Sequence, residues 1–174
     1  KIEGIMSGSV NYILTAVWNG KDFSFLFGEA KEMGLTEPDP VIDLSGMDIA
    51  RKLLILVRDA GFRYELSDIE ITPLAKRNAK DEVEYLDIDE MVREARAEGN
   101  KIKFIASFSE GELKVYPKVC SSDDPLFAVD DVKNVFIFYT KRYNKYPLVI
   151  MGPGAGVDIT ASGVLDDVLK VIGF

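Results

Sequence analysis

Apolar residues recur at helical spacing in five stretches of the chain. The pattern predicts helices over residues 10–18, 21–33, 47–60, 87–98 and 158–172. Ser7 and Ser9 precede the first stretch as candidate caps, and a glycine follows each of the next three. Between the second and third helices, Pro38 and Pro40 force an extended path.

Shorter stretches that are apolar, or that alternate between apolar and polar residues, predict strands. They cover residues 2–6, 69–71, 101–107, 112–119, 134–139 and 147–151. The turn Ser109-Glu110-Gly111 makes the third and fourth an antiparallel hairpin, and the charged residues up to 84 predict a loop. Because most helices precede most strands, we expect an α+β fold. Its mixed or antiparallel sheet would carry helices on one face and leave the other as a candidate dimer surface.

Length and charge narrow the class of protein. With 174 residues, 47% of them hydrophobic, the chain suits one compact domain or one domain with a terminal excursion. A net charge of -8 argues against binding nucleic acid or an anionic membrane. No apolar run of about 18 residues and no signal-peptide pattern is present. The single cysteine, Cys120, is expected to be a buried, inert thiol, so we expect a cytoplasmic protein.

The chain has no histidine, so any acid–base chemistry must use other side chains. Asp48 and Lys52 are four residues apart and share one face of a predicted helix, whose start carries Asp43, while Glu37 lies on the rigid turn before it. Carboxylates beside one amine suit a substrate with an ammonium group and a hydroxyl or carbonyl. A lysine relays protons near neutral pH only where burial or positive neighbours lower its pKa.

Two other interpretations of this spacing are open. Asp48 and Lys52 form a surface ion pair in the commoner case, with Asp43 as a helix cap. Alternatively, Glu37, Asp39, Asp43 and Asp48 would bind a divalent cation, which prefers oxygen ligands. Lys52 would repel such a cation and no calcium-loop spacing is present, so we rank this interpretation last and expect no metal.

Three ordered motifs resemble those of homoserine dehydrogenases, especially the form fused to aspartate kinase. The first combines residues 34–40, which read GLTEPDP, with residues 43–56, which read DLSGMDIARKLLIL. The second covers residues 4–13, which read GIMSGSVNYI, and the third covers residues 152–156, which read GPGAG. Members of this family interconvert L-homoserine and L-aspartate 4-semialdehyde with NAD(P) in threonine and methionine biosynthesis. The resemblance therefore implies an oxidoreductase whose protein groups position two reactants and manage one proton.

The resemblance also implies roles for individual residues. Lys52 matches the general acid/base, with Asp43 as a further acidic residue of the catalytic pocket. Glu37 and Asp48 match carboxylates that bind the homoserine amino group, and Ser9 a hydroxyl near the substrate. Two glycines match positions that approach the cofactor, Gly34 and Gly156. Ser9 is equally well explained as a helix cap, and the glycine-rich run alone lacks a dinucleotide fingerprint.

The resemblance divides the chain into two parts. Residues 1–151 would form a substrate-binding and dimerisation domain, and residues 152–174 a glycine-rich turn and helix that pack on an amino-terminal dinucleotide-binding domain. The chain opens on Lys1 inside a predicted strand and lacks that domain, so we expect part of a longer protein that is inactive alone and forms a homodimer. Leu35 replaces the family's usual aromatic residue. A non-catalytic dimerisation or regulatory module of the same fold is the alternative function.

Overall fold

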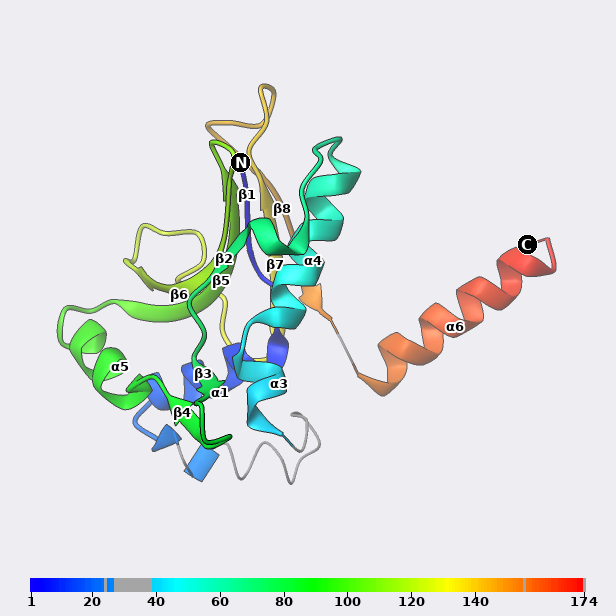
Figure 1. Ribbon diagram of the computed structural model, residues 1–174. Helices are drawn as coiled ribbons and strands as arrows, with labels where there is room; N and C mark the ends of the chain where they lie inside the picture. The colour runs from blue at the N-terminus through cyan, green and yellow to red at the C-terminus, as the bar shows by residue number, and fades with distance from the viewer. Residues whose placement is uncertain (24, 27–38, 155, 174) are drawn as a thin grey trace.

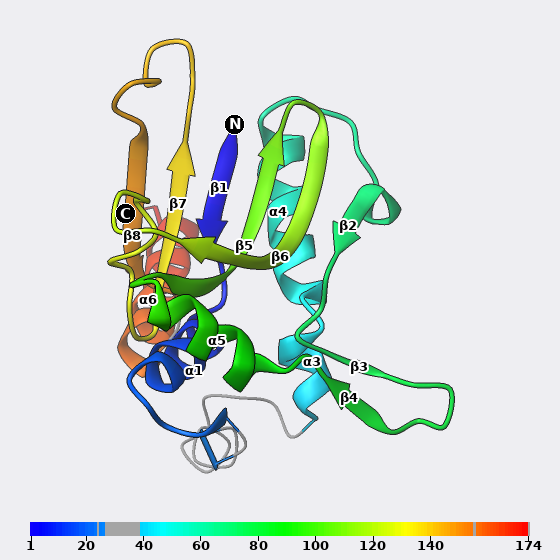
Figure 2. The same cartoon turned by 90° about the vertical axis from the view of Figure 1, so that its left-hand side faces the viewer.

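A six-stranded mixed sheet forms the centre of the computed structural model, which describes residues 1–23, 25–26, 39–154 and 156–173. The strand order is β2-β6-β5-β1-β7-β8, and it can be followed across Figure 2. The strands are β1 (Ile2–Ile5), β2 (Ile69–Ile71), β5 (Lys101–Ser109), β6 (Glu112–Cys120), β7 (Lys133–Phe138) and β8 (Leu148–Pro153). Only the β2–β6 pair is parallel. The predicted α+β class with a mixed sheet is confirmed.

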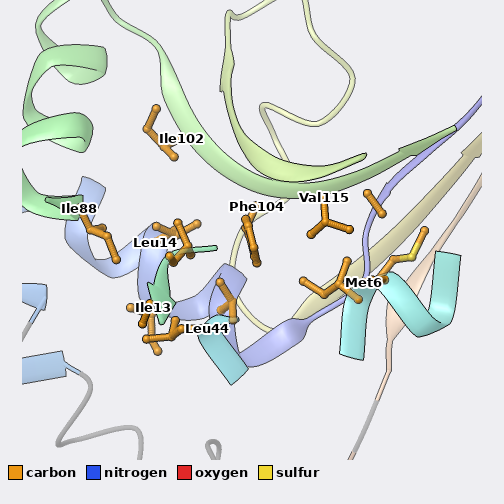
Figure 3. Packing of buried hydrophobic residues seen from close by; sticks show 14 of the residues in the cluster. Met6, Ile13, Leu14, Leu44, Ile88, Ile102, Phe104 and Val115 are labelled. Atoms are coloured by element: carbon orange, nitrogen blue, oxygen red, sulfur yellow. The ribbon is translucent and has the colours of Figure 1, made fainter. Parts of the chain in front are cut away.

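Helices pack on one face of this sheet (Figure 1). They are α1 (Gly8–Trp18), α4 (Met47–Asp59) and α5 (Ile88–Ala97), joined by the short α3 (Pro40–Leu44) and the 3-10 turn η1 (Leu66–Asp68). Between helices and sheet lies the main hydrophobic core, shown in Figure 3, where Leu14 and Leu44 of the helices meet Phe104 and Val115 of the sheet. Burial of this apolar surface is the main force that holds the layers together.

Local chemistry explains where these helices begin. The Ser7 hydroxyl accepts a hydrogen bond from the Val10 N–H at the start of α1, and the Asp39 carboxylate accepts one from the Val41 N–H at the start of α3. Gly46 precedes α4 with φ of 77°, and a Cβ there would lie 3.0 Å from the side chains of Phe104 and Val115. Glycine is therefore required at this corner both for its conformation and for its size.

Two local predictions were wrong. Asp43 was expected at the start of the helix that carries Asp48, but it lies in α3, which Ser45 and Gly46 separate from α4. The charged stretch expected as a loop forms a second sheet, in which β3 (Ala75–Arg77) pairs with β4 (Val83–Tyr85). Each of these strands is three residues long, too short for alternation to reveal.

The second face of the sheet is partly covered by the segment 121–132, which we call the strap. Its Leu126 and Val129 pack on Ile5, Ile105 and other residues of this face in a smaller core cluster. Cys120 is buried in the same cluster, and burial raises the pKa of its thiol to about 12. The thiol is therefore held in its neutral form, as expected for an inert cysteine.

The carboxyl-terminal part of the chain is the most exposed. Helix α6 (Val157–Val171) extends away from the sheet in Figure 1, and no residue of it is buried. Strand β8 forms a sheet edge on which Ile150 and Met151 remain exposed.

No helix in the described ranges combines the length and apolar character needed to cross a membrane. For the predicted helix over residues 21–33, residues 24 and 27–33 lie outside the described residues.

Candidate active site

A cavity of about 520 Å³ opens where α1 and α4 begin near the ends of β7 and β8. Its lining comes from four separate parts of the chain: Met6, Ser7, Gly8, Ser9, Asp43, Asp48, Lys52, Val132, Asn134, Gly154 and Gly156. The charged groups of this lining are two carboxylates and one amine. It can therefore receive a ligand that carries both a positive group and a proton-exchanging oxygen.

Helix α4 provides the charged wall of the cavity. The Lys52 Nζ atom lies 2.7 Å from an Asp48 carboxylate oxygen, and it donates a second hydrogen bond of 3.1 Å to the Met6 carbonyl oxygen. The two side chains remain 44% and 57% exposed, so a ligand can reach both groups. The pair is therefore loosely held, unlike a buried ion pair.

The start of α1 forms another part of the cavity wall. The Ser7 and Ser9 hydroxyls lie 3.1 Å apart, so each can hydrogen-bond the other at the helix start. Between them, Gly8 packs on the carboxyl end of the strap, and a Cβ at this position would lie 2.5 Å from the Val132 carbonyl oxygen. The absence of a side chain at Gly8 lets the two backbones meet and brings Val132 into the cavity wall.

A polar network fastens this end of the strap to α1. The Asn11 side chain donates hydrogen bonds to the carbonyl oxygens of Val129 at 3.1 Å and of Asp131 at 2.9 Å. Lys103, whose side chain is 1% exposed, lies 3.0 Å from an Asp130 carboxylate oxygen and also donates to Val129. The network therefore holds the backbone that leads into the cavity.

Burial and pairing oppose each other in this network. Burial lowers the pKa of Lys103, although Asp130 acts in the other direction. Burial raises the pKa of Asp130, but hydrogen bonds from Lys101 and Lys103 outweigh it and hold the pKa below its usual value. We take the network as ionised, because Asp130 keeps two cationic partners at 2.7 and 3.0 Å.

The Asp39 carboxylate has two structural partners outside the cavity lining. It caps α3, and its carboxylate pairs with Arg77 of the β3–β4 hairpin at 2.8 Å. The Arg77 guanidinium beside it holds the pKa of Asp39 below its usual value. In the part of the chain that the structure describes, no group of three or more acidic, cysteine or histidine side chains is arranged to hold a metal ion.

A second hollow, of about 380 Å³, lies on the opposite face of the sheet. Five of its six charged side chains pair with one another or with neighbouring residues: Lys118 lies 2.6 Å from Glu3 and 2.7 Å from Asp124, and Lys114 lies 2.8 Å from Glu112. These groups already satisfy each other, so this hollow is a weaker candidate for a catalytic site than the cavity beside α4.

Comparison with known proteins identifies the family. The model of the homoserine dehydrogenase family matches residues 1–169. The chain belongs to the homoserine dehydrogenase family. The resemblance drawn from the three sequence motifs is thereby confirmed.

Relatives of the family match nearly the whole chain. The bifunctional aspartokinase/homoserine dehydrogenase of Haemophilus influenzae is 40% identical over 181 residues, which cover 98% of this chain and 22% of that protein. The homoserine dehydrogenase of Schizosaccharomyces pombe is 37% identical over 99% of this chain and 51% of its own length. A solved homoserine dehydrogenase of Thiobacillus denitrificans has a TM-score of 0.77 at 29% identity and covers 98% of this chain and 38% of that one. The chain thus spans between 22% and 51% of the length of these relatives.

The structure brings most of the predicted homoserine dehydrogenase residues together. Ser9, Asp43, Asp48, Lys52 and Gly156 line the same cavity, although they come from α1, α3, α4 and the turn before α6. The predictions for two further residues, Glu37 and Gly34, lie outside the described residues. The role of each residue remains a prediction.

The motifs did not point to Asn134 as part of the cavity. It lies on β7, and alternation along that strand places its side chain on the same face as Phe136 and Phe138, which pack against the main core. A polar residue within this apolar set was a usable signal. A prediction that assigned the faces of the strand would have found it.

Proposed function

We propose that this chain provides the substrate pocket of an NAD(P)-dependent homoserine dehydrogenase, which interconverts L-homoserine and L-aspartate 4-semialdehyde in threonine and methionine biosynthesis. The observation that carries the proposal is the meeting of Ser9, Asp48 and Lys52 in one cavity. An amine and a carboxylate that both remain accessible can bind an amino acid and exchange a proton with it.

Carboxylates and hydroxyls would orient the substrate. Asp48 binds the substrate ammonium together with Glu37, and Asp43 adds negative charge to the same pocket. Ser9 lies at the start of α1, where its hydroxyl can hydrogen-bond the bound amino acid. The ligand is thereby held at two ends, which fixes the carbon that reacts.

Lys52 would manage the proton. In the oxidation, its neutral amine accepts the proton of the substrate hydroxyl as the O–H bond breaks and the C–O bond becomes a carbonyl. Bound NAD(P) supplies the acceptor for the hydride that leaves the same carbon. In the reverse direction, the Lys52 ammonium returns the proton to the oxygen. The reaction therefore requires one acid/base group and no histidine.

The turn before α6 fits one edge of a cofactor site. No heavy atom lies within 4 Å of the position that a Cβ of Gly156 would occupy, so its backbone is open to a ligand. The rest of the cofactor site would come from a dinucleotide-binding domain outside this chain. Helix α6 is suited to pack on that domain, because Val168 and Leu165 on it are at least half exposed.

We also propose a cytoplasmic homodimer. Two features favour self-association: the strap leaves part of the second sheet face uncovered, and the edge strand β8 exposes apolar side chains. Sedimentation velocity measures the oligomeric state of the chain, and a monomer at micromolar concentration argues against the homodimer.

The test joins this chain to a homologous dinucleotide-binding domain and measures homoserine-dependent reduction of NAD(P). Loss of a general acid/base costs about 10²–10⁴-fold in rate, so Lys52→Ala should reduce kcat by that factor. Lys80→Ala, an exposed lysine on the β3–β4 turn, is the matched control and should keep full activity. An assembled protein that folds and binds cofactor without any homoserine-dependent rate refutes the catalytic assignment and leaves the non-catalytic module.

A further inference from the structure

The structure raises a conflict over Asp48. Its carboxylate is already paired with Lys52 at 2.7 Å, yet the proposed function requires it to bind the ammonium of the substrate. Two cations beside one carboxylate repel each other. The arrival of the substrate therefore weakens the hold of Asp48 on Lys52.

Lys52 needs another acceptor once Asp48 is occupied. A lysine ammonium has three N–H donors, and the Met6 carbonyl oxygen, at 3.1 Å, accepts only one of them. The Ser7 and Ser9 hydroxyls line the same cavity and lie 3.1 Å from each other at the start of α1. A further oxygen near Lys52 would keep the ammonium in place.

Asn134, which lines the same cavity as Lys52, carries a candidate oxygen. Its Oδ1 atom is buried and has no hydrogen-bond partner, the one side-chain nitrogen or oxygen among the described residues in that state. A buried acceptor without a donor costs free energy, so this oxygen favours any donor that reaches it. Asn134 lines the cavity together with Lys52, and both also line the adjoining hollow beside β8.

The Asn134 amide lies against Gly154. A Cβ at Gly154 would overlap the Nδ2 atom of Asn134, whereas it would lie 3.6 Å from Oδ1. The nitrogen end of the amide therefore abuts the glycine-rich turn, and the oxygen end faces away from it. The glycine at this position leaves the amide its space.

We propose that Asn134 is a positioning residue for Lys52. When the ammonium of an amino-acid substrate occupies Asp48, the Lys52 ammonium turns to Asn134 Oδ1 and keeps its bond to the Met6 carbonyl. An amine that exchanges a carboxylate partner for a neutral oxygen gives up its proton more easily. Substrate binding thereby prepares Lys52 to act as a base. The inference rests on the proposed function and adds a residue to it.

The charges around Lys52 permit this exchange. The charged groups that line the cavity, among the described residues, are Asp43 from α3 and Asp48 from the same helix as Lys52; the adjoining hollow adds none. Asp43 also lines the cavity, and in the proposal it keeps its place when the substrate binds. The change that accompanies substrate binding is therefore the occupation of Asp48.

Kinetics of the assembled enzyme tests the proposal with two variants. Asn134→Leu has nearly the same size and no oxygen, so kcat should fall about 10–100-fold at neutral pH while KM for NAD(P) stays within about twofold. Asn134→Asp keeps an acceptor but makes it negative, so the acidic limb of the kcat–pH profile should move up by about one pH unit, with activity regained at higher pH. Asn144→Leu, in the exposed turn between β7 and β8, is the matched control.

A second measurement needs no turnover. The side-chain amide resonances of Asn134 in the 174-residue chain should shift on addition of L-homoserine, and this shift should disappear in Lys52→Met. An equal shift in Lys52→Met shows that the ligand itself contacts Asn134 and overturns the positioning role. The positioning role is also overturned if the enzyme is active and both Asn134 variants keep the wild-type kcat and pH profile. An inactive wild-type enzyme instead refutes the proposed function, and this inference with it.

Discussion

Two lysine–aspartate pairs in this molecule differ in how far they are exposed to solvent. Lys103 is 1% exposed and is surrounded by Asp130, Asn11 and a backbone carbonyl, whereas Lys52 is 44% exposed and is held by Asp48 and one carbonyl. A buried charge is costly unless every donor is satisfied, so the first pair is tied to the stability of the strap. The second pair gives up little when it opens, and a group of this kind is suited to exchange partners with a substrate.

The largest expected effect breaks the buried pair. Asp130→Ala leaves the ammonium groups of Lys101 and Lys103 without their shared carboxylate, which should lower the free energy of unfolding by roughly 2–4 kcal/mol. The value lies below that of a fully buried pair because Asp130 is 32% exposed. Urea denaturation followed by circular dichroism measures the change.

The double variant Lys103→Met with Asp130→Ala is the control for uncompensated charge. It should be more stable than Asp130→Ala alone, because the buried ammonium of Lys103 is then absent. Equal stability of the two would show that charge burial is not the cause of the loss.

A smaller effect comes from the joint between the strap and the cavity. Gly8→Ala places a Cβ 2.5 Å from the Val132 carbonyl oxygen, so one backbone must move. Overpacking of this kind costs about 1–3 kcal/mol in the free energy of unfolding, and it should also displace Val132 from the cavity wall. Gly152→Ala is the matched control, because no heavy atom lies within 4 Å of its added Cβ. Similar unfolding midpoints for the two variants would contradict this packing.

Acid should loosen the buried pair without any mutation. The pKa of Asp130 lies below its usual value of 3.8 in the folded protein, so the unfolded chain binds its proton first as the pH falls. Its contribution to stability is therefore present above that value and is lost as the pH drops through the folded pKa. Unfolding free energies measured between pH 6 and pH 3 should fall less steeply in Asp130→Asn than in the wild type. Parallel curves would show that Asp130 does not contribute to acid sensitivity.

The smallest effect on stability belongs to the exposed pair. Asp48→Asn should change the free energy of unfolding by less than about 1 kcal/mol, since exposed ion pairs contribute little. The same change removes the charge proposed to bind the substrate ammonium. KM for homoserine in the assembled enzyme should then rise roughly 10–100-fold, as expected for a lost charged hydrogen bond. A destabilised variant with an unchanged KM would show that Asp48 stabilises the fold and does not bind the substrate.

Local secondary structure could be predicted from the pattern of apolar, polar and turn residues. Helix α4 and the β5–β6 hairpin appear where spacing and turn residues place them, because each depends on contacts between residues close along the chain. The facing of Asp48 and Lys52 follows from helical geometry in the same way. The family motifs added the expectation that these residues meet Ser9, which local spacing alone does not contain.

Long-range contacts decided the rest. Alternation along β5 would place Lys101 and Lys103 on a solvent-facing side, yet the strap buries both. Strand β1 pairs with β5 and β7, and each residue of β1 is more than a hundred positions away from its partner along the chain. This pairing places Met6, directly after β1, beside Lys52. Asn134 joins the cavity for the same reason. Periodicity records which face of an element is apolar, but it does not record which distant segment will cover that face.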